Sequence, residues 1–220
     1  HEAGHAVVAL HCPASDPIHK ATIIPRGRAL GMVMRLPEGD RISLAREQIY
    51  ADLRVACGGR IAEELIFGEE RVTTGASSDI RMATDMARRM VTEWGMSDKL
   101  GFLAYNADEQ EVFLGRSVSQ QKNVSDNTAS VIDSEIRRIV DEAYTHATKI
   151  LKDNNDQLER LAQGLLEYET LNGDEIQIIV EGGTLSHEEP ADEIETPRAK
   201  RKRASIPGSS RSKKPGSEPA

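Results

Sequence analysis

The chain opens with the pentapeptide HEAGH, which places His1, Glu2 and His5 at the spacing of a metal-binding helix. On an α-helix His1 and His5 lie one turn apart on the same face, so both imidazoles could bind one zinc ion. The carboxylate of Glu2 could reach a water on that metal and accept its proton while the oxygen attacks a carbonyl carbon. The pattern predicts a zinc peptidase with Glu2 as the catalytic base. An ordinary amphipathic helix carrying two histidines is the alternative.

A catalytic zinc ion usually has three protein ligands, so a third ligand must lie elsewhere in the chain. His11 follows the motif at the distance of a third histidine, but Val8 stands where that longer pattern needs Gly to turn the backbone. A helix that continues through Val8 carries His11 more than one further turn away and out of reach. His19 follows two prolines, and we expect it to be a loop residue with a structural or surface role.

Three acidic residues are the remaining candidates for the third ligand. Glu63 and Glu64 lie in a predicted helix, where either could be a solvated acid, a ligand, or a partner that orients a ligand. Asp79 follows the small-residue turn TTGASS and falls in the first turn of the next helix, where the helix dipole favours an acid. It also shares a helix stripe with Ala83 and Met90, and a carboxylate on a buried stripe needs a partner such as a metal.

The composition favours a mainly α-helical fold. Only 4% of the residues are aromatic, so Ala, Leu, Ile and Val must fill the core. Apolar periodicity and breaker residues predict helices over 1–11, 43–67, 80–94, 125–151 and 155–168. Two strand-like runs, 21–24 and 31–36, predict a small β-sheet near the active site, and 103–114 is weakly strand-like. The pair Gly58-Gly59 within the second helix indicates a close helix crossing or a break.

The charge distribution divides the chain at residue 187. The whole chain carries a net charge of −8, of which 1–186 contribute −10. An acidic body argues against nucleic acid as a partner. Cys12 and Cys57 are too few for a disulfide framework or a cysteine-based zinc site. No apolar run approaches the roughly 18 residues that a membrane-spanning helix needs, so we expect this piece to be soluble.

We expect one zinc metallopeptidase domain over 1–186 and a disordered tail over 187–220. The tail is rich in Pro, Ser, Glu and Lys and lacks periodicity, so it cannot bury enough apolar surface to fold. Its KRKR run, Lys200 to Arg203, is either a solvated charged segment or a patch for nucleic acid, anionic lipid or localisation. Because the sequence starts with His1 inside a predicted helix, we expect it to be the C-terminal piece of a longer protein.

Six sequence blocks together resemble one known family. They are HEAGH, HKATIIPRGRALG from His19, LPEGD from Leu36, GGRIAEELIFG from Gly58, TTGASSDI from Thr73 and EVFLGRS from Glu111. In this order they are similar to the peptidase domain of the FtsH family, whose members are membrane-anchored, ATP-dependent zinc metalloproteases. The resemblance runs from residue 1 to about 170 and weakens over 171–183, where the family usually has a short helix.

The resemblance implies roles for four residues: His1, His5 and Asp79 as zinc ligands, and Glu2 as catalytic base. It also implies a homohexamer under a ring of AAA ATPase modules and anchoring by N-terminal transmembrane helices. The peptidase part would face the cytoplasm at a bacterial inner membrane. Substrates would be unfolded or unneeded membrane and cytosolic proteins. The chain has no Gly-rich phosphate loop ending in GK[ST], so ATP would be bound only by the domain upstream.

The predicted strand over 31–36 suggests how a substrate could bind. An exposed edge strand could pair with an extended polypeptide through main-chain hydrogen bonds, which would leave sequence specificity loose. An internal hairpin strand with both edges covered is the alternative. Two other classes of protein also stay open: a self-contained zinc peptidase without an ATPase motor, and a non-catalytic assembly domain. An intact Glu2 argues against the assembly domain, which has no need of a base.

Overall fold

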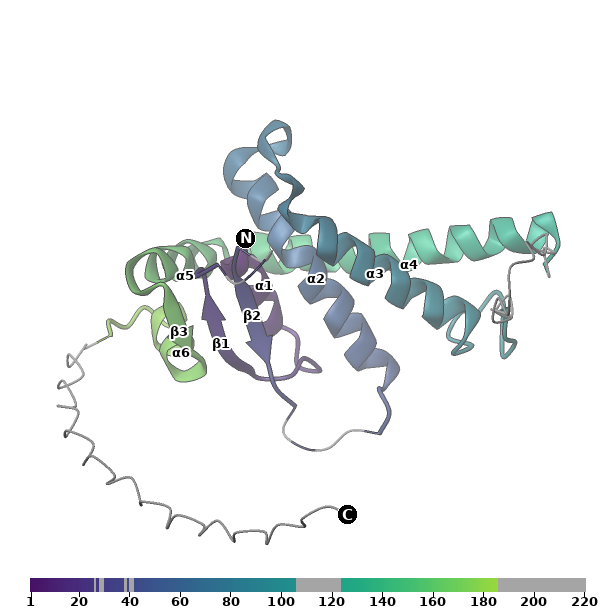
Figure 1. Cartoon of the computed structure of the whole chain (residues 1–220), viewed down its shortest axis with the longest axis horizontal. Helices are drawn as coiled ribbons and strands as arrows, with labels where there is room; N and C mark the ends of the chain where they lie inside the picture. The colour runs from purple at the N-terminus through teal and green to yellow at the C-terminus, as the bar shows by residue number, and fades with distance from the viewer. Residues whose placement is uncertain (26, 28–29, 38, 40–41, 106–123, 186–220) are drawn as a thin grey trace, which may run out of the picture. The chain divides into compact units, whose positions relative to one another are not determined.

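Helices dominate the fold and flank a three-stranded antiparallel sheet (Figure 1). The computed structural model describes residues 1–25, 27, 30–37, 39, 42–105 and 124–185. Residues His1–Leu185 form one compact unit. The predicted tail over 187–220 and most of the weakly strand-like segment, 106–114, lie outside the described residues. The remainder of that segment, 103–105, is not a strand. The prediction of a mainly α fold with a small sheet is confirmed.

The elements follow one another in a simple order. The helices are α1 (Glu2–Leu10), α2 (Arg46–Phe67), α3 (Ser77–Thr92), α4 (Asp126–Asp153), α5 (Asn155–Tyr168) and α6 (Gly173–Val180), with short 3-10 turns η1 (Glu69–Arg71) and η2 (Thr74–Ala76) between α2 and α3. The strands are β1 (Ile18–Thr22), β2 (Met32–Arg35) and β3 (Thr170–Asn172). All five predicted helices are present.

The strands differ more from prediction than the helices do. β1 begins three residues earlier than predicted, so His19 is an exposed strand residue and the prediction of a loop was wrong. β3 and α6 were not predicted from periodicity, because both are short. Their junction does carry a readable signal: the Asn172 side chain accepts the Glu175 N–H, and the Glu175 carboxylate accepts the Asn172 N–H. This reciprocal capping box starts α6.

Among the described strands, the order β2-β1-β3 places the segment 31–36 at an edge of the sheet. β1 is the central strand and pairs antiparallel with both neighbours, with Ala21 opposite Val33 of β2 and Leu171 of β3. β2 therefore has one edge without a paired strand among the described residues. An ion pair of 2.6 Å between Arg35 and Asp52 ties the end of β2 to α2.

Glycines allow α1 and α2 to cross at very close range. A Cβ atom added to Gly58 would lie 2.6 Å from the carbonyl oxygen of Gly4, and one added to Gly4 would lie 2.6 Å from the Ala62 Cβ. Neither position has room for a side chain. α2 continues without interruption through Gly58-Gly59, so the pair marks a close helix crossing and not a break.

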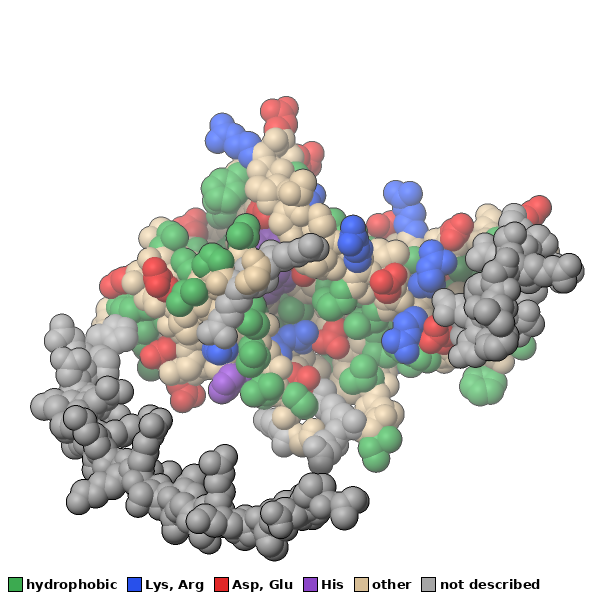
Figure 2. Space-filling model, viewed as in Figure 1, with side chains coloured by type: hydrophobic (Ala, Val, Ile, Leu, Met, Phe, Trp, Pro, Cys, Tyr) green, Lys and Arg blue, Asp and Glu red, His purple; other side chains and the backbone are tan. Residues whose placement is uncertain are grey.

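Two clusters of buried aliphatic residues form the core. One joins α1 to the sheet, α5 and α6, and the other joins the N-terminal half of α2 to α3 and α4. α2 contributes to both clusters, which makes it the shared scaffold of the unit. Within the described part of the chain, no helix is both long and apolar enough to cross a membrane. Acidic and basic side chains are interspersed on the face that Figure 2 shows.

Candidate metal centre

The first turn of α1 brings the two histidines of the HEAGH motif together. The Nε2 atoms of His1 and His5 lie 3.1 Å apart. Their ring centroids are 4.8 Å apart, and the ring planes are nearly perpendicular. His5 is buried and His1 is partly buried, so both imidazoles point inward from the start of the helix. This is the arrangement that the i, i+4 spacing predicts.

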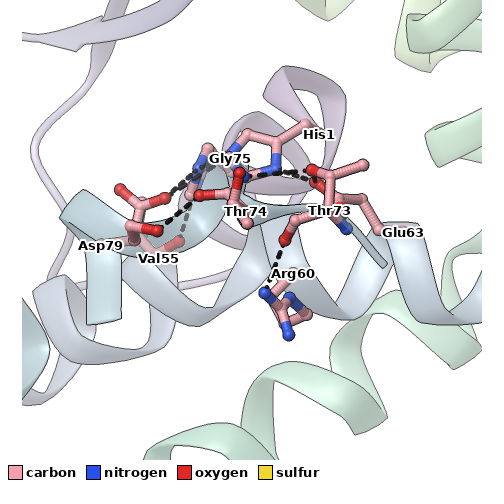
Figure 3. A network of polar contacts seen from close by, with 10 residues as sticks. His1, Val55, Arg60, Glu63, Thr73, Thr74, Gly75 and Asp79 are labelled. Carbon is pink, nitrogen blue, oxygen red and sulfur yellow. Dashed lines mark hydrogen bonds and ion pairs between the residues drawn. The ribbon is translucent and has the colours of Figure 1, made fainter. Parts of the chain in front are cut away.

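Asp79 reaches the two histidines from the first turn of α3 (Figure 3). Its Oδ2 atom lies 3.4 Å from the Nε2 atom of His1 and 3.5 Å from that of His5. Among the described His, Cys, Asp and Glu residues, this trio forms the group whose side-chain atoms could hold a metal ion. The structure thus brings together all three residues that the sequence suggested as ligands.

The separations among these atoms fit a zinc ion. Zinc binds imidazole nitrogen and carboxylate oxygen at about 2.0–2.2 Å in tetrahedral sites, which places neighbouring ligand atoms about 3.4 Å apart. The three separations of 3.1, 3.4 and 3.5 Å scatter closely around that value. Two nitrogens and one oxygen are also a common donor set of catalytic zinc sites, which keep a fourth position for water or substrate.

Hydrogen bonds on the far side of each ring select the nitrogen that faces the centre. The Nδ1 atom of His5 lies 2.7 Å from the Val55 carbonyl oxygen, which can only accept, so Nδ1 carries the proton. The Nδ1 atom of His1 lies 2.7 Å from Oε1 of Glu63. Both rings are left with Nε2 free to bind a metal, and such partners also fix ring orientation.

The sequence left three alternatives for Glu63: a solvated acid, a ligand, or a partner that orients a ligand. The contact with His1 makes it such a partner. It is only 6% exposed, which rules out the solvated acid, and its carboxylate also accepts the Thr73 N–H at 2.8 Å. Burial raises the pKa of Glu63, but the hydrogen bonds from Thr73 and His1 outweigh it and hold that pKa below its ordinary value. Glu64 instead accepts a hydrogen bond from the Tyr144 hydroxyl and lies apart from the trio.

The other histidines lie away from the centre. His11 is exposed, and its Nε2 atom is 2.7 Å from Oε1 of Gln157 on α5. The prediction that α1 carries His11 out of reach, because Val8 continues the helix, is confirmed. His19 lies on β1 and is exposed.

The charges of His1, His5 and Asp79 shift the pKa values of His1 and Asp79 even without a metal ion. Burial raises the pKa of Asp79, yet hydrogen bonds and charge from His1 and His5 outweigh it and keep that pKa below its ordinary range. The Asp79 carboxylate in turn raises the pKa of His1 above its usual value. Asp79 is therefore ionised at neutral pH, as a metal ligand must be.

Glu2 lies between this trio and the start of β2. A Cβ atom added to Gly31 would be 2.7 Å from both Cγ and Oε1 of Glu2, so the carboxylate packs against the backbone just before Met32. Burial raises the pKa of Glu2, while the two histidines oppose the rise. A carboxylate in this position beside the trio could act as a general base.

Gly59 is a residue of the site that sequence reasoning missed. A Cβ atom at this position would lie 2.6 Å from Nε2 of both His1 and His5. The absence of a side chain therefore leaves the space in which the imidazoles meet. The Gly58-Gly59 pair indicated a helix crossing, but nothing in the sequence showed which of the two faces the histidines.

Comparisons with known proteins agree with this geometry. The model of peptidase family M41 matches residues 1–179. The chain is 58% identical over 182 residues to an ATP-dependent zinc metalloprotease FtsH of Caulobacter vibrioides, which covers 83% of the chain and 29% of that protein. Proteins of the same name from Rickettsia bellii and Haemophilus influenzae are 53% and 52% identical, over 86% and 80% of the chain and 29% and 28% of those proteins. The chain thus spans less than a third of the length of these relatives. It belongs to peptidase family M41.

Proposed function

We propose that this chain is the zinc-dependent endopeptidase part of an ATP-dependent protease. The observation that carries the proposal is the trio of His1, His5 and Asp79, whose ligand atoms lie 3.1–3.5 Å apart, as a tetrahedral zinc site requires. The family match and the names of the relatives support the same chemistry.

Each residue of the site has a defined task in this proposal. His1 and His5 would hold a zinc ion through Nε2, and Asp79 would hold it through a carboxylate oxygen. A zinc ion held there would supply Lewis acidity toward water and the scissile carbonyl. Glu2 would accept the proton of the attacking water on its carboxylate and later donate it to the departing amine nitrogen. Glu63 and the Val55 carbonyl keep the two imidazoles in the tautomer and orientation that ligation needs.

The free edge of β2 is the proposed binding surface for the polypeptide substrate. An extended segment paired with Met32–Arg35 would run past Gly31, where the backbone touches the Glu2 carboxylate. Main-chain hydrogen bonds carry the affinity in this mode of recognition, so many sequences would be accepted. Loose specificity suits a protease that degrades unfolded or unneeded proteins, and we propose such membrane and cytosolic proteins as substrates.

We extend the proposal to the whole protein on the strength of the relatives. Their printed names describe ATP-dependent zinc metalloproteases, and they continue well beyond the matched region. We propose an AAA ATPase module upstream that binds the ATP, a homohexameric assembly, and a membrane anchor with the peptidase part on the cytoplasmic side. Nucleic acid is not a partner in this proposal.

The test compares the full-length protein with its Glu2→Gln and Asp79→Asn variants, by metal analysis and by casein cleavage with and without ATP. We expect about one zinc per subunit and ATP-dependent cleavage in the unmodified protein. Glu2→Gln should keep its zinc and lose at least about 100-fold in cleavage rate, because only the base is removed. Asp79→Asn should lose most of its zinc.

Three outcomes would contradict parts of this proposal. Full zinc retention by Asp79→Asn would remove Asp79 from the ligand set. Equal cleavage with and without ATP would favour a self-contained peptidase. Normal cleavage by Glu2→Gln would refute the role of the base.

A further inference from the structure

The Glu63 carboxylate joins two segments that approach the metal centre from different directions. Its Oε1 atom lies 2.7 Å from Nδ1 of His1, and its Oε2 atom accepts the Thr73 N–H at 2.8 Å. The Thr73 hydroxyl donates to Oε1 at 3.3 Å. One buried side chain of α2 thus binds both a candidate ligand and the segment that leads to Asp79.

Thr73 is held from its other side by Arg60 (Figure 3). The Nη2 atom of Arg60 donates to the Thr73 carbonyl oxygen at 2.8 Å. Arg60 and Glu63 are three residues apart on α2, so they project from the same face one turn apart. The Nε atom of Arg60 is buried and has no hydrogen-bond partner in the described part of the chain. Side chains from two consecutive turns of α2 therefore bind the backbone of Thr73 through hydrogen bonds.

A short, hydrogen-bonded segment connects Thr73 to Asp79. The Thr73 hydroxyl accepts the N–H of Gly75 at 3.1 Å and so starts η2. The Ser77 hydroxyl donates to the Thr74 carbonyl oxygen, and α3 begins at Ser77. Five residues, 74–78, separate Thr73 from Asp79, and they form this hydrogen-bonded turn and the first residues of α3. Because this connection is short and hydrogen-bonded, we expect a displacement of Thr73 to shift Asp79 as well.

We propose that Arg60 and Thr73 are positioning residues of the metal centre. They fix the 73–76 turn on α2, and this sets Asp79 at ligand distance from His1 and His5. The inference rests on the proposed zinc chemistry. The buried contacts that join α2 to α3, which include Ile49, Leu53, Ala83 and Met90, lie in a separate cluster. Loss of the Arg60 contact should therefore loosen the turn while α3 stays packed.

The test measures metal binding by the full-length protein and not only its activity. Zinc affinity is determined by competition with a chromogenic chelator, and the visible spectrum of the cobalt-substituted protein reports on coordination geometry. Arg60→Ala should bind zinc about 10-fold or more weakly, as is typical when the outer partners of a zinc site are lost. Its cobalt spectrum should lose intensity, because a displaced carboxylate departs from tetrahedral geometry. Arg60→Lys keeps one donor and should recover part of the affinity.

Thr73→Val supplies a second, independent variant. Valine keeps the shape and the backbone N–H of threonine but removes the hydroxyl that binds Glu63 and Gly75. We expect a smaller, several-fold loss of zinc affinity, and Thr73→Ser should restore it. Arg81→Ala, an exposed arginine on α3 close in sequence to Asp79, is the matched control and should bind zinc normally.

Two results separate this inference from the proposed function. If Arg60→Ala and Thr73→Val keep normal zinc affinity and an unchanged cobalt spectrum while Asp79→Asn loses both, the positioning role is wrong and the metal centre stands. If the unmodified protein binds no zinc, the proposed function fails first. A metal-free melting temperature of Arg60→Ala far below that of the unmodified protein would show that Arg60 supports the fold and not the turn.

Discussion

Each imidazole of the candidate metal centre has a hydrogen-bond partner at Nδ1, which leaves its Nε2 atom free to bind a metal. The Nδ1 atom of His5 donates to a backbone carbonyl, which no side-chain substitution can remove. The Nδ1 atom of His1 depends on the carboxylate of Glu63. The site therefore has one candidate ligand oriented by the main chain and one oriented by a replaceable side chain, and only the second orientation can be tested by mutation.

Glu63→Gln should weaken zinc binding by about 10- to 100-fold, the usual range for a lost outer partner of a zinc ligand. Glutamine keeps the size of the side chain but removes the charge that His1 and Thr73 share. Chelator competition on the full-length protein measures the change. Glu64→Gln is the matched control, because the neighbouring carboxylate binds Tyr144 and not the trio. Equal zinc affinity in the two variants would contradict the assignment.

At this scale the sequence was informative where spacing alone decides the geometry. His1, Glu2 and His5 follow from helical periodicity, and the small-residue turn with its apolar stripe pointed to Asp79. The role of Glu63 remained open because Glu63 and Glu64 are consecutive on α2. Which of them meets α1 depends on how the two helices pack, and periodicity does not determine that. Gly59 was missed for the same reason.

β2 is the element on which the proposed substrate binding depends. Its outer edge is unpaired among the described residues, and Arg35 fastens its end to Asp52 of α2. An edge strand tolerates proline better than a central strand does, because it has fewer ladder hydrogen bonds to lose. A proline in β2 can therefore disturb substrate pairing without unfolding the sheet.

Val33→Pro should reduce peptide cleavage by at least about 10-fold while zinc content stays normal, because a main-chain donor is lost and the strand edge is reshaped. Cleavage of a fluorogenic peptide and metal analysis are measured on the same preparation. Val33→Thr, which keeps a β-branched shape and the N–H, serves as the control. Normal turnover by Val33→Pro would exclude pairing along β2.

Glu135 is a buried acid of α4 that binds residues of the segment after α3. Glu135 is 1% exposed and accepts hydrogen bonds from Ser97 and Arg138, and it forms an ion pair with Lys99. Arg138 makes the largest contribution to holding the pKa of Glu135 at about 2, against an ordinary value of 4.5. The carboxylate therefore stabilises the fold above about pH 4.5, and this contribution is lost as the pH falls toward 2.

Glu135→Gln should cost about 2 kcal/mol of local stability at neutral pH, since Lys99 and Arg138 are partly exposed and solvent screens part of the pairing. Hydrogen exchange read by mass spectrometry should speed up in α4 and around Ser97. The variant should also lose the part of the stability decrease that we expect from Glu135 in the unmodified protein as the pH falls from 4.5 toward 2. The same exchange rates in both proteins at pH 7 would contradict the stabilising role.

Prediction at the element scale succeeded for helices and was weaker for strands. The helices were recognised because long apolar stripes and breaker residues define them. β1 starts at Ile18, earlier than expected, because its first residues alternate poorly and gain their strand character only from pairing with β2. β3 is three residues long and is defined entirely by its pairing with β1, a contact between residues about 150 positions apart.

Across the whole described unit, the candidate metal centre brings together helices that pack in different buried clusters. His1 and His5 belong to α1, which packs in the cluster with the sheet, while Asp79 belongs to α3, which packs in the other. A zinc ion bound to all three residues would connect the clusters directly. Ligands that bind only the folded state stabilise it in proportion to their affinity and concentration.

Removal of zinc with a chelator should therefore lower the melting temperature of the peptidase part by several degrees, in line with ligand-linked stability. Differential scanning calorimetry of the full-length protein, with and without added zinc, measures this shift. Glu2→Gln should retain the shift, because it keeps every ligand, whereas Asp79→Asn should lose most of it. A melting temperature independent of zinc in the unmodified protein would argue against a bridging ion.

The glycines at the crossing of α1 and α2 have a consequence for saturation mutagenesis. Gly4, Gly58 and Gly59 have no space for even a methyl group, and at Gly59 that methyl would collide with the imidazoles themselves. In a library selected for proteolysis, these positions should be as intolerant as His1, His5 and Asp79. Intolerance alone would then not separate residues that act on the substrate from residues whose smallness makes room for them. A parallel selection for abundance would separate the two groups, since ligand variants can still fold while bulky residues at the crossing push the helices apart.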